Sequence, residues 1–250
     1  MPQNQMNRFF VEKFNIGNDS IVIDNKDDIH HIKDVIRLKE NDYIIISDSN
    51  QFEYTCQIIF IGSEEIEARI MDKQKFAREP KIRVTLFQGI PKQDKMETIA
   101  QKCTELGLAT LVPVFMDRTV VVDNGEYWKK VVRLQSIAEE ASKQCQRGIV
   151  PEIRQACDSK SMIERLHNFD LVIFPYEEEQ YFTIKNLLRG IPVNPIDIAV
   201  IIGPEGGFSE REAAAVKAAG GRAVSLGKTI LRTETAGIAA FAMIMYELEM

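Results

Sequence analysis

A glycine-rich segment is the most chemically suggestive part of the chain. It follows an apolar run at 198–202 that is typical of a buried strand, and it reads Ile202-Gly203-Pro204-Glu205-Gly206-Gly207. Glycines let the backbone approach a ligand closely, and exposed N–H and C=O groups in such a turn can hydrogen-bond an adenine or a carboxylate. Ligands of open α/β sheets bind beyond the carboxyl ends of the strands. The segment therefore predicts either a ligand-binding loop or a tight strand-to-helix turn without a ligand.

A second candidate loop follows the next predicted strand, residues 223–226. It ends in Arg232, Thr233 and Glu234, where Thr233 is expected to cap a helix. Gly221 and the run 227–229 resemble a phosphate-binding loop, but five residues separate the glycines where that cradle needs four. This spacing weakens the interpretation as a nucleotide hydrolase. The loop is either a salt-bridged helix cap or a ligand loop, and two such loops on successive strands favour a shared site.

The elements that position these loops alternate between strand and helix after residue 80. A capping box of Ser209 and Glu212 begins one of the helices. This alternation predicts an α/β domain with a mainly parallel sheet. The predicted strands are 83–88, 110–114, 171–175, 198–202 and 223–226, and the predicted helices are 92–107, 127–147, 209–219 and 233–248.

The first part of the chain has a different pattern. One helical stretch, 27–35, interrupts a series of short strands predicted at 9–11, 20–23, 42–47, 52–61 and 65–70. Many short strands at close spacing predict a small barrel. A polar stretch at 72–80 ends in proline, so we place a domain boundary there: a barrel domain over 1–72 and an α/β domain over 73–250.

Composition and charge limit the possible classes of protein. The 250 residues are 45% hydrophobic and 27% charged, which excludes a wholly disordered chain. No apolar run is long enough to cross a bilayer and the first residues lack an apolar leader, so we expect a cytoplasmic protein without a membrane partner. The formal net charge of −6 argues against coating nucleic acid by bulk charge, but residues 81–154 carry 12 basic and 9 acidic side chains and leave RNA possible. Four cysteines without a C-x-x-C pair and three histidines predict no metal site.

These motifs closely resemble the SPOUT class of knotted methyltransferases, and more narrowly the bacterial 16S ribosomal RNA uracil-N3 methyltransferase family. The resemblance is most specific over 201–240 and extends over nearly the whole chain, including 8–10, 30–37, 88–92, 95–97, 101–107 and Arg118. One departure is Gln146, where the family often has glycine before a basic residue.

The resemblance implies a PUA-like β-barrel for RNA followed by a SPOUT domain with a deep trefoil knot, which departs from the rule that chains do not thread loops. It also implies a homodimer that binds S-adenosyl-L-methionine and methylates N3 of a uracil in 16S ribosomal RNA of the small subunit, either as free RNA or in the assembled particle. The cofactor residues that it implies are Ile202, Gly203, Pro204, Glu205, Gly206, Gly207, Leu226, Gly227, Ile230, Leu231, Arg232, Thr233, Thr235 and Ala236.

The chemistry of this reaction suggests roles for three charged residues. Methyl transfer from a sulfonium is an in-line displacement that depends on alignment, and N3 of uracil must lose its proton before it attacks. Arg232 is the candidate for stabilising negative charge on the base edge or for orienting the base. Glu205 and Glu234 are candidates for accepting the proton or for fixing the arginine. The alternative for all three is a purely structural role, in an ion pair at a helix terminus.

The candidate RNA contacts are Arg8, Lys92, Lys95 and Arg118, each of which could instead lie on a solvated surface. Duplex RNA hides its base edges, so a specific uracil is expected to be read unstacked, with Phe208 either stacking on it or belonging to the core. Two alternative functions stay open: another SPOUT activity such as ribose 2′-O methylation, and a non-catalytic RNA-binding module.

Overall fold

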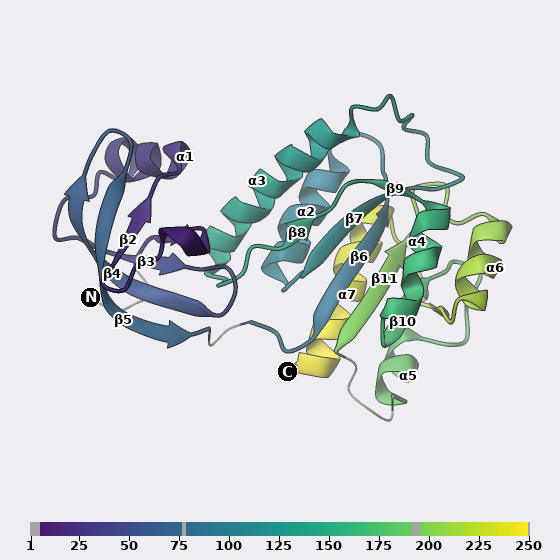
Figure 1. The fold of residues 1–250 in the computed structure, drawn as a ribbon. Coiled ribbons are helices and arrows are strands. Elements are labelled where there is room, and N and C mark those ends of the chain that lie inside the picture. The colour runs from purple at the N-terminus through teal and green to yellow at the C-terminus, as the bar shows by residue number, and fades with distance from the viewer. Residues whose placement is uncertain (1–5, 77–78, 192–195, 250) are drawn as a thin grey trace. The chain divides into compact units, whose positions relative to one another are not determined.

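The chain folds into two compact units. The computed structural model describes residues 6–76, 79–191 and 196–249 (Figure 1). The first unit is formed by Met1–Glu79 together with Ser142–Val150, and the second by Pro80–Ala141 together with Pro151–Met250. This division differs from the expected boundary after residue 72, because strand β5 (Ile66–Lys75) runs past that point and its last residue pairs with Phe52.

The first unit is built on a five-stranded mixed sheet of order β1-β3-β4-β5-β2. The strands not yet given are β1 (Arg8–Phe10), β2 (Ser20–Ile23), β3 (Tyr43–Ser47) and β4 (Phe52–Ile61). The ladder between β1 and β3 is parallel, and the others are antiparallel. The predicted small barrel thus takes the form of one sheet, whose core side chains include Phe9, Ile21, Ile44, Ile58 and Ile66.

A short helix α1 (Lys26–His30) covers part of this core and continues as a π-turn over His31–Val35. The Asn25 side chain accepts hydrogen bonds from the backbone N–H groups of Asp27 and Asp28, at 2.9 and 3.2 Å, which satisfies two donors that a helix start leaves unpaired. The prediction of helical structure over 27–35 is confirmed. Ile29 and Ile32 point into the core, as their helical spacing predicts.

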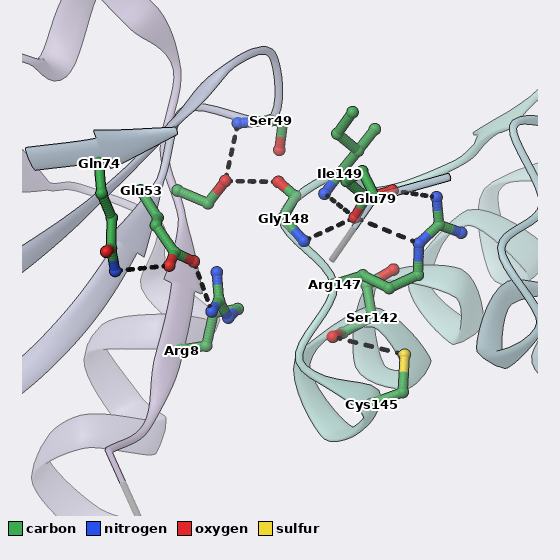
Figure 2. A network of polar contacts seen from close by, with 11 residues as sticks. Arg8, Ser49, Glu53, Gln74, Glu79, Ser142, Cys145, Arg147, Gly148 and Ile149 are labelled. Atoms are coloured by element: carbon green, nitrogen blue, oxygen red, sulfur yellow. Dashed lines mark hydrogen bonds and ion pairs between the residues drawn. The ribbon is translucent and has the colours of Figure 1, made fainter. Parts of the chain in front are cut away.

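The segment Ser142–Val150 is held to the first unit by the carboxylate of Glu79 (Figure 2). Its Oε1 accepts from the N–H groups of Gly148 at 2.8 Å and Ile149 at 3.1 Å, and its Oε2 accepts from Arg147 Nη2 at 2.9 Å. Ser47 Oγ donates to the carbonyl of Gly148. Gln146, which departs from the glycine expected there from the resemblance, has a φ of 61°, the left-handed region that glycine adopts most easily.

The second unit is an α/β sandwich on a seven-stranded sheet. Its main path is β12-β10-β11-β6-β7-β8, β9 pairs with β7, and every ladder is parallel. The strands are β6 (Arg83–Gly89), β7 (Thr110–Phe115), β8 (Glu152–Ile153), β9 (Cys157–Asp158), β10 (Leu171–Pro175), β11 (Asp197–Ile202) and β12 (Arg222–Val224). The helices are α2 (Lys95–Glu105), α3 (Tyr127–Cys145), α4 (Ser159–Arg165), α5 (Ile184–Arg189), α6 (Glu210–Ala218) and α7 (Thr233–Glu249).

Helices cover both faces of this sheet, and the strands alternate between two cores. On β11, Ile198, Val200 and Ile202 pack under α2, α3, α5 and α7, whereas Ala199 and Ile201 pack under α4 and α6 (Figure 1). A strand buried on both faces needs a continuous apolar sequence, which is what 198–202 provides. All predicted strands and helices of this domain are present. The sequence analysis did not predict α4 and α5, which have only seven and six residues.

No helix in the described part of the chain is long and apolar enough to cross a membrane. The expectation about a leader rests partly on residues 1–5, which lie outside the described residues.

We predict that Glu79→Ala lowers the free energy of unfolding by about 3 kcal/mol, because it takes the carboxylate partner from Arg147, which is only 7% exposed, and a hydrogen-bond acceptor from two backbone N–H groups. Urea unfolding followed by circular dichroism measures this. Glu64→Ala, a truncation of an exposed glutamate in the same unit, is the control. Equal stability of the Glu79 and Glu64 variants would show that the carboxylate does not hold the segment.

Candidate functional site

Three loops that are far apart in the sequence meet at one edge of the parallel sheet. The strands β12, β10, β11 and β6 are neighbours in that order, and their carboxyl ends share the edge. The loops are 90–94 after β6, 203–209 after β11 and 225–232 after β12. Both loops singled out by their sequence therefore lie where α/β sheets bind ligands.

The glycine-rich loop is a tight turn packed between neighbours. Gly207 N–H donates to the carbonyl of Pro204 at 2.9 Å, and Gly207 has a φ of 68°. A Cβ on Gly207 would collide with the carboxylate of Glu177, and a Cβ on Gly89 would lie 2.5 Å from the nitrogen of Pro204. Glycine is therefore required at position 89 because a Cβ would meet backbone, and it is favoured at position 207 by the positive φ, since the exposed Glu177 side chain can move aside.

The helix after this loop begins as predicted. The Ser209 and Glu212 side chains form the capping box at the start of α6. The Ser209 hydroxyl also donates to Asp117 at 2.7 Å, and this hydrogen bond, with that of Arg211, holds the pKa of Asp117 below its usual range. Phe208 is 3% exposed and packs edge-to-face on Phe174, so it belongs to the core.

A chain of hydrogen bonds ties three segments together beneath the loops. Gln88 at the end of β6 donates through Nε2 to Gly89 O and to Thr233 Oγ1, both at 2.9 Å. Thr233 Oγ1 in turn donates to Gly203 O at 2.6 Å. Gln88 Oε1 is buried without a hydrogen-bond partner and faces Gly237. We expected Thr233 to precede α7 as its cap, but it is the first residue of the helix and its hydroxyl makes the contact with Gly203. The carbonyl of the preceding residue, Arg232, accepts the hydrogen bond from the N–H of Ala236.

A lysine and two glutamates form a charged cluster beside this chain of hydrogen bonds. Lys95 Nζ, at the start of α2, donates to Glu205 Oε1 at 2.7 Å and lies 3.5 Å from Glu234 Oε2. The backbone N–H of Lys92 also donates to Glu205. Burial acts to raise the pKa of Glu205, but the hydrogen bonds from Lys95 and the backbone outweigh it and hold that pKa below its usual range. Glu234 Oε2 is buried and accepts no hydrogen bond.

The remaining predicted residues have different surroundings. Arg232 and Ile230 are exposed, and Leu226 and Leu231 are partly buried. Arg118 is exposed and donates to the carbonyl of Gly206 at 2.9 Å, and Lys92 is exposed. The structure therefore brings Glu205, Glu234 and Lys95 together, and Arg118 adjoins the glycine-rich loop.

Arg8 lies in the other unit. Its guanidinium is buried, and it donates to Glu53 Oε2 at 2.7 Å, while Gln74 donates to the other oxygen of Glu53 at 2.8 Å (Figure 2). The expectation of a free surface cation for RNA does not match this position, because the charge faces Glu53 rather than solvent.

The sequence analysis missed the loop that lies between the two candidate loops. The chain after β10 pairs with Ser225, whose N–H donates to Phe182 O at 2.9 Å and whose carbonyl accepts from Ile184 at 3.0 Å. Its Glu177 contacts Gly207 on the other side. The available signal was topological: in a parallel sheet, the loop after a predicted strand at 171–175 ends at the same edge.

A cavity of about 330 Å³ lies between the loop after β6, α2 and α3. Its lining includes Pro91, Met96, Tyr127 and Arg133. It shares no residue with the loops after β11 and β12, so we do not assign the predicted ligand to it.

Comparison with known families and structures identifies the two units. A model of RNA methyltransferase domains matches residues 78–245, and a model of RNA methyltransferase PUA domains matches residues 23–71. The ribosomal RNA small subunit methyltransferase E of Bacillus subtilis is 31% identical over 252 residues, which cover 98% of each chain.

Solved structures agree with this match. That of ribosomal RNA small subunit methyltransferase E from Neisseria gonorrhoeae bound to S-adenosyl methionine superposes with a TM-score of 0.83, at 28% identity, covering 96% of this chain and 97% of that one. A putative methyltransferase from Legionella pneumophila in complex with the same cofactor gives 0.84, at 28% identity and 97% and 98% coverage. The chain belongs to the family of ribosomal RNA small subunit methyltransferase E, with a PUA domain followed by an RNA methyltransferase domain.

Proposed function

We propose that this protein transfers a methyl group from S-adenosyl-L-methionine to N3 of a uracil in 16S ribosomal RNA. One observation supports the site above all: the glycine-rich loop after β11 and the loop after β12 meet at one sheet edge and are joined by the bond from Thr233 to Gly203. Family membership and the cofactor named in the Neisseria and Legionella structures support the choice of ligand.

The cofactor pocket in this proposal is formed by residues 202–207 and by Leu226, Gly227, Ile230, Leu231, Arg232, Thr233, Thr235 and Ala236. Backbone N–H and C=O groups of both loops would hydrogen-bond the adenine and the methionine carboxylate. The small volume of Gly203, Gly206 and Gly207 lets the backbone approach these groups. The apolar side chains of Leu226 and Leu231, which are only partly buried, supply the surface on which the adenine ring packs.

The chemical step needs an acceptor for the N3 proton. The proton passes to a carboxylate, the N3 electron pair forms a bond to the methyl carbon, and the carbon–sulfur bond breaks with its electron pair staying on sulfur. Glu205 and Glu234 are both candidates for the acceptor role. Glu234 Oε2 is buried and lies 3.5 Å from Lys95 Nζ. Arg232 is exposed beside Glu234 in the sequence and suits the stabilisation of negative charge on the base edge.

RNA binding in this proposal involves the exposed cations Lys92 and Arg118, which flank the glycine-rich loop through Glu205 and Gly206. The target uracil would be read unstacked, because its N3 is otherwise engaged in base pairing. The substrate is the free RNA or the assembled small subunit. The homodimer and the trefoil knot, which the family resemblance implies, and the cytoplasmic location, which the sequence composition implies, stay predictions.

The reaction is tested by the modification it leaves. In a strain that lacks the gene, we expect mass spectrometry of digested 16S RNA to show loss of one 3-methyluridine, restored by the gene in trans. Retention of 3-methyluridine with loss of a 2′-O-methyl nucleoside would instead assign ribose methylation. Full retention of every modification, with no heat of S-adenosylmethionine binding, would assign a non-catalytic RNA-binding module.

We predict that Arg232→Ala lowers kcat about 100-fold or more, while the Kd for the cofactor changes less than about threefold, since the arginine acts on charge that develops in the transition state. Methyl transfer from labelled cofactor and isothermal calorimetry measure the two quantities. Arg222→Ala, at the opposite end of β12, is the matched control. Equal losses in kcat and in affinity would show that the Arg232 side chain serves mainly to bind the cofactor and not to stabilise charge on the base.

We predict that Thr233→Val weakens cofactor binding about tenfold, because it removes the donor to Gly203 O and the acceptor for Gln88 while keeping the shape of the side chain. Thr233→Ser keeps the hydroxyl and should bind almost as the native protein does. Calorimetry decides the point: unaltered affinity in the valine variant would mean that the loops do not depend on this bond.

A further inference from the structure

The cavity between the loop after β6, α2 and α3 has apolar walls. Pro91, Met96, Tyr127 and Leu134 line it, and all four residues are buried. Its volume of about 330 Å³ lies at the lower end of the range of roughly 300–1,000 Å³ that is usual for ligand sites. The cavity therefore suits one small ring system and is too small for a helix of a protein partner.

The rim of the cavity carries polar groups that the protein itself leaves unused. Gln93, Asp94 and Lys130 line the cavity, and all three are exposed. Among the described residues, none offers a hydrogen-bond or ion-pair partner to the end of any of these three side chains. The amide and the ammonium donate hydrogen bonds, and the carboxylate and the amide oxygen accept them. Apolar walls with both kinds of group at the rim match a nucleobase, which has an apolar face and a polar edge.

The charges around the cavity cancel. Arg133 donates to both oxygens of Glu97, through Nε at 2.5 Å and Nη2 at 2.9 Å, and both residues line the cavity. The remaining charged residues of the lining are Asp94 and Lys130, which are opposite in sign. A lining without net charge gives no strong attraction for a free phosphate, whereas it accommodates an uncharged base.

The loop 90–94 connects this cavity to the proposed methyl-transfer site. Pro91 and Gln93 line the cavity, and the backbone N–H of Lys92, between them, donates to Glu205 of the glycine-rich loop at 3.1 Å. Gln93 has a φ of 58°, a conformation that costs free energy in a residue with a side chain and that is found most often at functional sites. A ligand in the cavity therefore lies against the same loop that contacts the glycine-rich loop.

We infer that this cavity binds one unstacked base of the substrate RNA other than the target uracil, with its edge on Gln93 and Asp94. This inference rests on the proposed function and adds a second point of recognition to it. The phosphates of this nucleotide lie outside the cavity, beside the exposed side chains of Lys92 and Lys130. A contact to a second base lets the enzyme select one uracil by its sequence context, which a pocket for uracil alone does not do.

Met96 in the cavity wall is a native reporter for the first arm of the test. The full chain, labelled at the methionine methyl groups and saturated with S-adenosylhomocysteine, is titrated with the 5′-monophosphates of uridine, cytidine, adenosine and guanosine. We expect a saturable shift of the Met96 methyl resonance with at least one of them, and none with ribose 5-phosphate, which has no base. Met162, 1% exposed in the core on the other face of the sheet, is the internal control. No shift of Met96 with any nucleotide, or an equal shift with ribose 5-phosphate, would overturn the inference.

The second arm uses Asp94→Ala, which removes an acceptor at the rim without removing a helix cap. We expect the Kd of the bound nucleotide to rise about fivefold, the value of one hydrogen bond, and the KM for RNA to rise by a similar factor with kcat unchanged. Glu126→Ala, which truncates an exposed carboxylate outside the lining, is the matched control and should behave as the native protein does. Equal values for the Asp94 and Glu126 variants would contradict the assignment of the base edge.

The titration requires no methyl transfer, so the two proposals fail separately. A native protein that forms 3-methyluridine and shows no shift of Met96 would overturn only the role of the cavity. A native protein that forms no 3-methyluridine would overturn the proposed function. A Met96 resonance that shifts on dilution of the protein and then ignores the nucleotides would assign the cavity to a second copy of the chain, which also overturns the inference.

Discussion

The hydroxyl of Thr233 lies between the carbonyl of Gly203 and the side-chain amide of Gln88, and only one arrangement of hydrogen bonds satisfies these groups. Gly203 O and Gly89 O can only accept hydrogen bonds, so Thr233 must give its proton to the first and Gln88 must turn its NH₂ group toward the second. The remaining NH₂ proton of Gln88 then fits the lone pair of Thr233 Oγ1. This single set of bonds fixes the end of β6, the end of β11 and the start of α7 relative to one another. This arrangement leaves the buried Gln88 Oε1 without a hydrogen-bond partner, which costs free energy. The orientation of the amide is therefore fixed by the two bonds that its NH₂ group donates.

The charged cluster of Lys95, Glu205 and Glu234 combines locally unfavourable positions with stabilising contacts between distant parts of the sequence. Lys95, with a helix start that is poorly capped, and Gln93, in a left-handed conformation, are locally unfavourable. Their compensation is the contact with Glu205 across 110 positions in the sequence. Glu205 accepts hydrogen bonds from Lys95 Nζ and from the backbone N–H of Lys92, whereas the buried Oε2 of Glu234 makes only an ion pair of 3.5 Å with the same ammonium. The two glutamates, which the sequence presents as equivalent, therefore differ in their contacts.

Much of the architecture follows from local patterns, and much of the site does not. The continuous apolar run 198–202 and the capping box of Ser209 predict β11 and the start of α6, because burial on both faces and unpaired helix N–H groups impose short-range requirements. The helices α4 and α5 escaped notice because two turns give too short a period to recognise. Lys95 was interpreted as a candidate RNA contact or a solvated surface charge, since nothing in its neighbourhood reveals a partner 110 residues away. The partner of Arg8 was not visible in the sequence for the same reason: Glu53 is brought beside it by the pairing of β1 with β3 and of β3 with β4.

The most direct test is a crystal structure of the protein with S-adenosylmethionine bound. We expect the adenine and the methionine carboxylate to contact residues 203–207 and 226–236, with the sulfonium methyl group pointing toward the space beside Glu234 and Arg232. A cofactor found in the cavity between α2 and α3, or a methyl group directed away from Glu234, would refute the site described here.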